Sequence, residues 1–277
     1  MKLREARKAL AVAVKAARAA GALMLQNRYA KKKINQASHH DIKLELDVRC
    51  QKRIEMILLA AFPGFAVLGE EGVRGDQNAE YRWVVDPIDG TVNFAYGIPH
   101  ACVSIALQAK VSSSGFRVPS SGLHHTRSVG EYQTLLGVVY DPFCDELWTA
   151  IRGQPARLNG RIIHVSKRRE LKEAIVGIGF AKGTDTLERM VNTFNGLIRR
   201  VRKMRIMGAA ALGLVYVASG RLEAYAEYGI RLWDIAAGGL ILECAGGDFW
   251  HAPLEGKHTY HVIGNNGLVR RQMLNAK

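Results

Sequence analysis

The sequence predicts a mixed α/β fold: helices first, then mainly antiparallel strands, then strands and helices in alternation. Two features predict it. β-branched and aromatic runs dominate residues 81–151, and from residue 174 onward short strand-like runs alternate with helix-like ones. The 277 residues allow one large domain or two small ones. The sequence has no linker long enough to let one half move independently of the other. We therefore expect two subdomains, 1–152 and 153–277, that share one interface and one site.

The first elements are predicted to be two helices. Residues 4–28 place apolar side chains such as Leu10 and Val14 near helical spacing, with basic residues on another face. An alanine-rich, basic, acid-poor start is also typical of a transit peptide, but the helical spacing of its apolar side chains favours a structural helix. A second helix is expected over Val48–Ala61, with Asp47 at its head, ending before Phe62-Pro63-Gly64.

Strands follow these helices. We expect them at Phe65–Leu68, Tyr81–Val85, Val103–Gln108, Leu135–Tyr140 and Glu146–Ile151, the third and fourth being paired. Between residues 110 and 133 the chain is rich in Ser, Gly and Pro and has no apolar period, so it is expected to be a mobile loop. The adjacent His124 and His125 in this loop are interpreted as solvated side chains.

The second half is predicted to alternate between the two kinds of element. The expected strands are Ala174–Ile178, Leu222–Tyr225 and His261–Ile263. The expected helices are Leu187–Ile198, Gly208–Ser219, Asp234–Cys244 closed by Gly246-Gly247, and one last helix at the end of the chain. His258 and His261 lack a third ligand nearby, so they are interpreted as a loop residue and a strand start.

The chain is strongly basic. It has 39 Lys and Arg against 25 Asp and Glu, a formal charge of +14. Such a surface attracts phosphorylated substrates, nucleic acid or acidic partners. Residues 1–33 hold ten Lys and Arg against the single acid Glu5, and residues 189–205 hold six and no acid. Both runs are interpreted as solvated basic faces, because no C2H2, RRM or KH motif supports a nucleic-acid site.

Compartment and membrane contact are inferred from composition. The apolar runs fall short of the ~18–20 residues that a helical span requires, so no membrane contact is expected. The four cysteines, Cys50, Cys102, Cys144 and Cys244, form no CxxC pair. Reduced thiols in a cytoplasmic protein are therefore expected.

The segment Asp86-Pro87-Ile88-Asp89-Gly90-Thr91 directly follows a predicted buried strand. Asp, Pro and Gly at these positions predict a tight bend. The bend can aim two carboxylates and a free backbone carbonyl at one point, and such hard oxygen donors suit Mg²⁺. Gly90 allows close backbone approach, and Thr91 begins a short helical segment whose N–H groups can cradle a phosphate.

Two further acidic sites are less specific by themselves. Gly69-Glu70-Glu71-Gly72 places carboxylates on a turn after a strand, a common arrangement. Asp234 opens a helix, where an Asp is most often an N-cap. Beside the Asp86–Thr91 bend, Asp234 becomes a candidate third wall of a metal site.

These segments resemble the signature motifs of the inositol monophosphatase family, the Mg²⁺-dependent, lithium-sensitive phosphatases related to fructose-1,6-bisphosphatase. The resemblance lies in Gly69-Glu70-Glu71, Trp83–Phe94 and Trp233–Gly247, and extends to Asp47, Gly137–Pro142 and Gly208-Ala209-Ala210. It covers nearly the whole chain. It implies a layered α/β/α/β/α sandwich and, by analogy, a homodimer.

The resemblance also implies a set of site residues. Glu70, Asp86, Asp89, Asp234 and the Ile88 carbonyl would hold two or three Mg²⁺ ions, with Glu70, Asp86 and Ile88 on the first and Asp86, Asp89 and Asp234 on the second. Asp47 and Thr91 would orient and deprotonate the attacking water. Gly90 and Thr91 would bind the phosphate through backbone N–H groups, and Ala210, Glu227 and Asp234 would contact an inositol ring.

The substrate remains open at this point. Glu227 favours inositol phosphate, because a carboxylate can accept hydrogen bonds from ring hydroxyls. Fructose 1,6-bisphosphate, histidinol phosphate and 3′-phosphoadenosine 5′-phosphate are the alternatives.

The 110–133 loop and the high charge depart from the family pattern. Because some bacterial members resemble this chain and contact RNA or the transcription machinery, a binding role motivated by the two basic runs is the alternative of another class. A dead scaffold is disfavoured because every acidic ligand is present.

Overall fold

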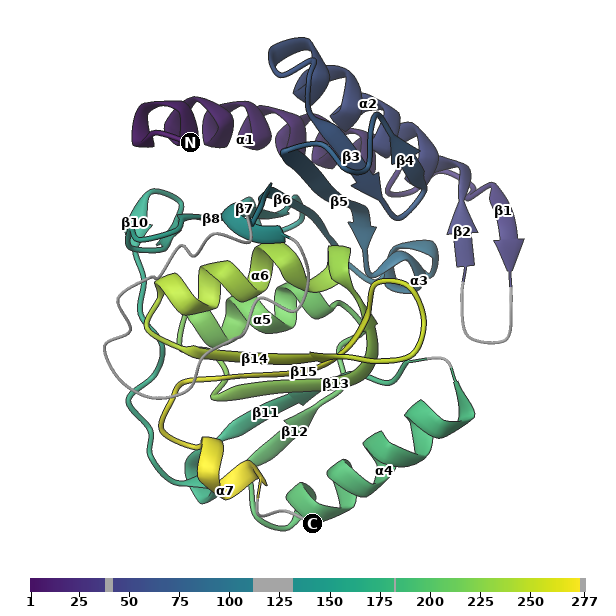
Figure 1. The fold of residues 1–277 in the computed structure, drawn as a ribbon. Coiled ribbons are helices and arrows are strands. Elements are labelled where there is room, and N and C mark those ends of the chain that lie inside the picture. Colours follow the sequence, from purple (N-terminus) through teal and green to yellow (C-terminus); the bar gives the residue numbers. More distant parts are fainter. Residues whose placement is uncertain (38–41, 112–131, 182, 275–277) are drawn as a thin grey trace.

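The structure, a computed structural model, describes residues 1–37, 42–111, 132–181 and 183–274, and arranges them in five layers (Figure 1). Helices cover the outer face of each of two sheets, and a third helix pair lies between the sheets. The layers are, in order, α1 (Leu3–Gln26) with α2 (Glu45–Ala61); an eight-stranded sheet; α5 (Ala210–Ala218) with α6 (Leu232–Cys244); a five-stranded sheet; and α4 (Thr184–Ile198) with α7 (Arg270–Leu274). The α/β/α/β/α sandwich is confirmed.

The first sheet has the order β10-β9-β8-β7-β6-β5-β3-β4, and only β3 and β5 pair in parallel. The expected antiparallel first half, with β6 paired to β7, is therefore confirmed. The strands are β3 (Ala66–Gly69), β4 (Gly72–Arg74), β5 (Tyr81–Asp89), β6 (Cys102–Lys110), β7 (Tyr132–Asp141), β8 (Glu146–Ile151), β9 (Arg157–Leu158) and β10 (Arg161–Ile162). Most of the predicted 110–133 loop, including both of its histidines, lies outside the described residues.

The second sheet has the order β12-β11-β13-β15-β14. Strand β11 pairs in parallel with β12 and β13, and β15 pairs antiparallel with β13 and β14. The strands are β11 (Ile175–Ile178), β12 (Lys203–Arg205), β13 (Ala224–Arg231), β14 (Asp248–Pro253) and β15 (Thr259–Asn265). The remaining elements are the hairpin β1 (Ile34–Ala37) and β2 (Ile42–Leu44), α3 (Thr91–Ala95) and a 3-10 turn at Leu171–Glu173.

Helix α1 packs a stripe of alanines against the first sheet. Ala9, Ala13, Ala16 and Ala20 are fully buried at helical spacing, so the predicted first helix is confirmed. By length and composition alone α1 could cross a membrane, so the expectation that every apolar stretch is too short for one is wrong. Its small side chains instead serve close packing: a Cβ at Gly21 would lie 2.6 Å from the Tyr140 ring.

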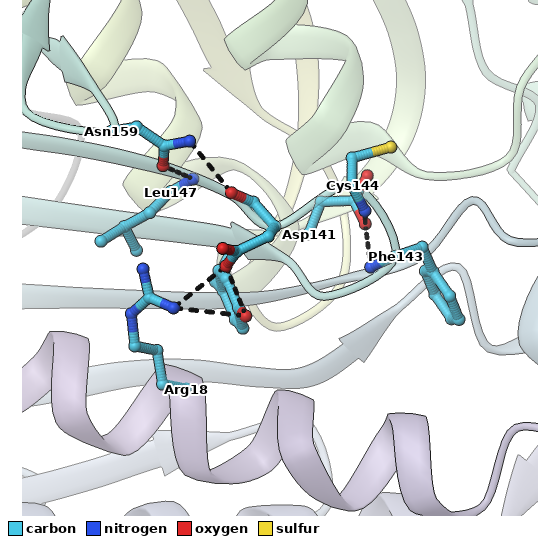
Figure 2. A network of polar contacts seen from close by, with 8 residues as sticks. Arg18, Asp141, Phe143, Cys144, Leu147 and Asn159 are labelled. Atoms are coloured by element: carbon cyan, nitrogen blue, oxygen red, sulfur yellow. Dashed lines mark hydrogen bonds and ion pairs between the residues drawn. The ribbon is translucent and has the colours of Figure 1, made fainter.

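A polar network ties α1 to the turn between β7 and β8 (Figure 2). Arg18 Nη1 donates to Asp145 Oδ1 over 3.0 Å, and the Tyr140 hydroxyl donates to the same oxygen over 3.0 Å. Asp141 Oδ1 accepts the backbone N–H of Phe143 over 2.8 Å and shapes the turn itself. The Gly137–Pro142 motif therefore serves the fold here, at the same end of the first sheet as Asp89, since β6 pairs Cys102 with Asp89 and Val103 with Tyr140.

The two expected subdomains meet at the middle helix layer. Helix α6 contacts β6 and β7 of the first sheet and β14 and β15 of the second. Strands β9 and β10, which follow residue 152, extend the first sheet beyond β8. The division at 152 and 153 stays a prediction.

Candidate functional site

A cavity of about 870 Å³ opens where the end of β5 meets the starts of α5 and α6. It gathers acidic and backbone groups that are far apart in the sequence. The predicted site residues that line it are Glu70, Asp86, Ile88, Asp89, Gly90, Thr91, Ala210, Glu227 and Asp234. Asp47 is not among the lining residues.

The acidic segment of β5 is a bulged strand. The predicted tight bend after Val85 is wrong in this respect, because β5 continues to Asp89. Asp86 pairs with Ser104 and Asp89 with Cys102 on β6, so Pro87 and Ile88 form a bulge between the pairs. The backbone N–H of Ile88 donates to Asp86 Oδ1 over 3.0 Å. The bulge places Asp86, Ile88 and Asp89 together on the cavity wall.

Asp89 is held by the first turn of α5. Its Oδ1 accepts the N–H of Ala210 over 3.2 Å, and its Oδ2 accepts the N–H of Ala211 over 2.7 Å. The Cys102 thiol lies 3.6 Å from Oδ2 and donates to it. The first N–H groups of a helix lack partners within the helix, so a carboxylate is stabilised there. Ala210 thus lines the cavity at the start of α5, where its backbone N–H orients Asp89.

Gly90 and Thr91 form a tight corner after the bulge. Gly90 has φ +89°, and a Cβ there would lie 2.9 Å from the carbonyl oxygen of His100. Only glycine fits that backbone and that approach. Thr91 begins α3, as expected, and its hydroxyl donates to the Ile88 carbonyl over 2.8 Å.

The turn that carries Glu70 is fixed by α2. Gln51 Oε1 accepts the N–H of Glu71 over 2.9 Å, and Gln51 Nε2 donates to the carbonyl of Gly72 over 3.1 Å. A Cβ on Gly69 would lie 2.3 Å from Gln51 Oε1. Glu70 itself donates its N–H to the carbonyl of Val85 over 3.1 Å. Helix α2 therefore fixes the position of the Glu70 turn relative to β5.

Asp234 enters the cavity from the first turn of α6. Its Oδ2 accepts the N–H of Arg231 over 3.1 Å. Arg231 is the N-cap and Asp234 the third residue of α6, so the expectation that Asp234 is the N-cap is wrong, and its carboxylate instead reaches back to the N-cap N–H. The Ser104 hydroxyl donates to the carbonyl of Trp233 over 3.0 Å and fixes the helix start against β6. Asp234 also shares a side-chain hydrogen bond with Asp86.

Burial and crowding raise the pKa values of these carboxyls. Burial, followed by the charges of Glu70, Asp234 and Asp89, raises the pKa of Asp86 well above its usual value. Burial raises the pKa of Asp89 to about 7, against the lowering effect of the two α5 N–H groups. Burial and the charge of Asp89 raise the pKa of Asp234 to about 8. The site retains protons when no cation is bound.

Glu227 lies on β13 and lines the same cavity. The Tyr225 hydroxyl donates to Glu227 Oε2 over 2.5 Å. Gly179 leaves room for this pair, because a Cβ there would lie 2.0 Å from the same oxygen. Glu227 is therefore presented to the cavity in one orientation.

The sequence model of the inositol monophosphatase family matches residues 5–112 and 129–273. The chain belongs to the inositol monophosphatase family.

Relatives within this family carry two kinds of name. A Pseudomonas aeruginosa protein named Nus factor SuhB is 37% identical over 272 residues, 93% of this chain and 91% of that protein. A Solanum lycopersicum protein named inositol monophosphatase 1 is 37% identical over 245 residues, 86% of this chain and 82% of that protein. The crystal structure of the extragenic suppressor protein suhB from Bartonella henselae superposes with a TM-score of 0.82 at 30% identity, covering 96% of each chain.

The family resemblance implies Mg²⁺, and the donors in this chain fit that ion by their chemistry. Carboxylates and a backbone carbonyl are the oxygen ligands that Mg²⁺ prefers. Their pKa values are raised first by burial and then by neighbouring carboxylates, whose charge a cation would neutralise. Within the described part of the chain, no three of these side chains meet at the spacing of a formed metal site. Asp86 and Asp234 are hydrogen-bonded to each other instead.

Asp47 occupies a different place from the other predicted site residues of this family member. It is 3% exposed in the first turn of α2, and its Oδ2 accepts the N–H of Leu44 over 2.7 Å. It was expected just before a helix that starts at Val48; the helix starts at Glu45 instead, so Asp47 is its third residue. Its expected action on the attacking water stays a prediction.

Sequence reasoning missed the residues that orient the acidic groups. Gln51, Cys102, Ser104 and Tyr225 were not singled out. Strand register could have found two of them, since a β6 strand paired with β5 places Ser104 and Cys102 opposite Asp86 and Asp89. For Gln51 no local pattern gave a signal, because its partners lie about twenty residues along the chain.

Proposed function

We propose that this chain is a Mg²⁺-dependent phosphate monoester hydrolase whose first substrate is an inositol monophosphate. The observation that carries the proposal is the joining of four carboxylates from three chain segments at one cavity wall, in a member of the inositol monophosphatase family.

The proposed ligands follow the family expectation. Glu70, Asp86 and the Ile88 carbonyl serve a first ion, and Asp86, Asp89 and Asp234 a second, in a site for two or three ions. When bound, such ions lower the pKa of a coordinated water and neutralise charge on the phosphate and on the leaving oxygen.

The chain's own groups position the substrate. The backbone N–H groups of Gly90 and Thr91 are proposed to bind the phosphate, at a corner that the glycine conformation makes tight. Thr91 and Asp47 are proposed to orient and deprotonate the water. Glu227 and Asp234 are proposed to accept hydrogen bonds from ring hydroxyls, and Ala210 is proposed to contact the ring.

The test is phosphate release from a panel, with Mg²⁺ and with a chelator. The panel is inositol 1-phosphate, fructose 1,6-bisphosphate, histidinol phosphate and 3′-phosphoadenosine 5′-phosphate. Asp89→Asn and Asp234→Asn are expected to lose at least about a hundredfold in kcat/KM, because each removes a charged metal ligand. Asp76→Asn, which changes an exposed carboxylate outside the cavity, is the matched control.

One result would overturn the proposal. If folded protein, shown by circular dichroism, releases phosphate from none of the panel in Mg²⁺, the monoester hydrolase function is wrong for these substrates. Turnover of only one alternative substrate would keep the reaction and replace inositol phosphate.

Three family properties belong to the same proposal. The protein is proposed to be a homodimer, to reside in the cytoplasm and to be inhibited by lithium. Sedimentation of the purified chain, fractionation of cells that express it, and phosphate release in increasing lithium test these properties one by one.

A second candidate is a binding role toward RNA or the transcription machinery. Relatives such as the Pseudomonas protein carry the name Nus factor, and this chain has a charge of +14. The structure places the two basic runs on separate outer layers, one on α1 and the other along α4 and β12 (Figure 1). In the second run Arg200 Nη2 donates to the carbonyl of Gln272, which links the segment after α4 to α7.

The binding role predicts an effect of charge that does not depend on the acidic site. Arg199→Gln with Arg202→Gln should weaken RNA binding at physiological salt, and Asp234→Asn should not. Lys2→Gln with Arg4→Gln, at the start of α1, is the matched pair on the other layer. RNA affinity equal to that of an unrelated basic protein would remove this candidate.

A further inference from the structure

The thiol of Cys102 lies directly behind the acidic wall of the cavity. Cys102 begins β6 and pairs with Asp89 on β5, and residues that face each other across two strands share one face of the sheet. Its Sγ lies 3.6 Å from Asp89 Oδ2 and donates to it. Because Cys102 is fully buried, no solvent molecule can take its place as the donor to this oxygen.

The bonds that Asp89 already accepts limit what else it can bind. A carboxylate offers about four lone pairs, two on each oxygen. Oδ2 accepts the N–H of Ala211 over 2.7 Å as well as the Cys102 thiol, so both of its lone pairs are in use. Of the bonds that the structure describes, Oδ1 accepts one, the N–H of Ala210 over 3.2 Å. One lone pair therefore remains for a cation, and it is on Oδ1.

Divalent cations differ in how they use a carboxylate. Mg²⁺ demands a near-octahedral arrangement of oxygens at about 2.0–2.1 Å, and the two oxygens of one carboxylate lie too close together to fill neighbouring octahedral positions. Ca²⁺ takes about six to eight oxygens at about 2.3–2.6 Å and accepts one or both oxygens of a carboxylate. A carboxylate that offers a single oxygen therefore suits Mg²⁺ and leaves Ca²⁺ one ligand short.

We propose that the Cys102 thiol restricts Asp89 to coordination through one oxygen and thereby favours Mg²⁺ over Ca²⁺ at the acidic wall. The inference rests on the proposed hydrolase function and adds the residue that determines the cation selectivity of its metal site. Cys102 is a positioning residue, because it acts through Asp89. A side chain without a donor would free a lone pair of Oδ2 and let the carboxylate turn, so that both oxygens could face one Ca²⁺ ion.

The test measures the binding of each ion alone, without substrate. A ligand that binds only the folded state raises its stability, so the thermal unfolding midpoint rises with the concentration of Mg²⁺ or of Ca²⁺. The two titrations give an apparent dissociation constant for each ion. Their ratio is the selectivity, and it is compared between the parent chain and its variants.

Three substitutions separate the hydrogen bond from the volume of the side chain. Cys102→Ala and Cys102→Val both remove the donor, and Cys102→Val refills the space. Both should shift the ratio toward Ca²⁺ by about threefold to tenfold, because hydrogen-bond partners of metal ligands alter metal affinity about tenfold or more and a thiol is a weak donor. Cys102→Ser restores a donor and should keep the ratio within about twofold of the parent value.

The matched control is Cys244→Ala. The Cys244 thiol also donates over 3.6 Å, to the carbonyl of Ile151, and Cys244 is not among the residues that line the cavity. This variant should leave the ratio unchanged. An unchanged ratio in both Cys102→Ala and Cys102→Val overturns the proposal. A Cys102→Ser variant that shifts the ratio as far as Cys102→Val also overturns it, because the volume and not the donor would then set the selectivity.

Failure of the hydrolase function is a separate outcome. If the parent chain binds Mg²⁺ and the Cys102 variants shift the ratio, but no phosphate is released, the role of Cys102 stands and only the reaction is wrong. If phosphate is released in Mg²⁺ and the ratio does not shift, the reaction stands and the role of Cys102 is wrong. If neither ion raises the midpoint of the parent chain, the proposal is overturned together with the metal site.

Discussion

Asp89 shows how one side chain can serve the fold and the site together. Its two oxygens accept N–H groups from the first turn of α5, while the residue lines the cavity. Each oxygen of a carboxylate has a second lone pair, so binding the helix start leaves capacity for a cation. The helix N-terminus favours the charged form and burial favours the protonated one, which places the pKa at about 7.

The pair of Tyr225 and Glu227 gives a prediction at this scale. Tyr225→Phe removes the hydroxyl that donates to Glu227 Oε2 over 2.5 Å. Because the carboxylate then loses its fixed orientation, KM for inositol 1-phosphate should rise about threefold to tenfold, and kcat should change less. Steady-state kinetics measure both constants.

The control is Tyr29→Phe, which changes a tyrosine that is 88% exposed and should alter neither constant. A Tyr225→Phe enzyme with an unchanged KM would show that the hydroxyl does not position Glu227.

At the scale of elements, the corner between β5 and α3 depends on one glycine. Gly90 and Gly97 both have positive φ values, +89° and +76°. A Cβ on Gly90 would meet the His100 carbonyl oxygen at 2.9 Å, whereas a Cβ on Gly97 would meet nothing within 4 Å. A side chain at either position would therefore strain the backbone, but only at Gly90 would it also lack room.

This pair predicts a measurable difference in stability. Gly97→Ala should lower the free energy of unfolding by about 1 kcal/mol, through strain alone. Gly90→Ala should lower it by at least about 1 kcal/mol more, because it adds a steric clash. Urea unfolding of the two variants measures the difference, and equal losses would mean that the His100 segment moves aside freely.

The long elements could be predicted from sequence, and the short edge strands could not. Helix α1 and strand β8 have clear periods, and the structure places them within two residues of the predicted ends. Strand β12 has three residues, two of them basic, and β14 contains a histidine and ends on a proline. Their pairing comes from neighbours far along the chain, which a local pattern does not show.

The candidate site, too, could be predicted only in part from the sequence. The acids of the Asp86–Thr91 segment were visible because they follow a strand at a turn-like sequence. Their gathering with Glu227 and Asp234 depends on two sheets meeting across α5 and α6. The bulge that keeps Asp86 and Asp89 within β5 has no sequence signature.

At the scale of the whole molecule, the crowded carboxyls predict a dependence of stability on pH. The pKa values of about 7 for Asp89 and about 8 for Asp234 lie above the ordinary 3.8. Above about pH 4 the unfolded chain releases protons that the folded, metal-free protein keeps, so these groups make the protein less stable as pH rises to about 8. Mg²⁺ replaces the protons and should reverse this loss.

Thermal unfolding tests this expectation. In a chelator, the midpoint should fall between about pH 5 and about pH 8, and added Mg²⁺ should raise it more at the higher pH. Asp234→Asn should flatten the fall, because it removes one of the two groups. A chelated protein with the same slope in Asp234→Asn as in the parent chain would contradict the assignment.

The position of α6 between the sheets has a consequence for how the chain is made. The first sheet is complete once residue 162 has been synthesised, but the face that α6 covers stays bare until residues 232–244 emerge. During that interval the nascent chain exposes an apolar sheet, the kind of surface that chaperones bind and that favours aggregation. A chain terminated before α6 should therefore be insoluble, even though every strand of the first sheet is present.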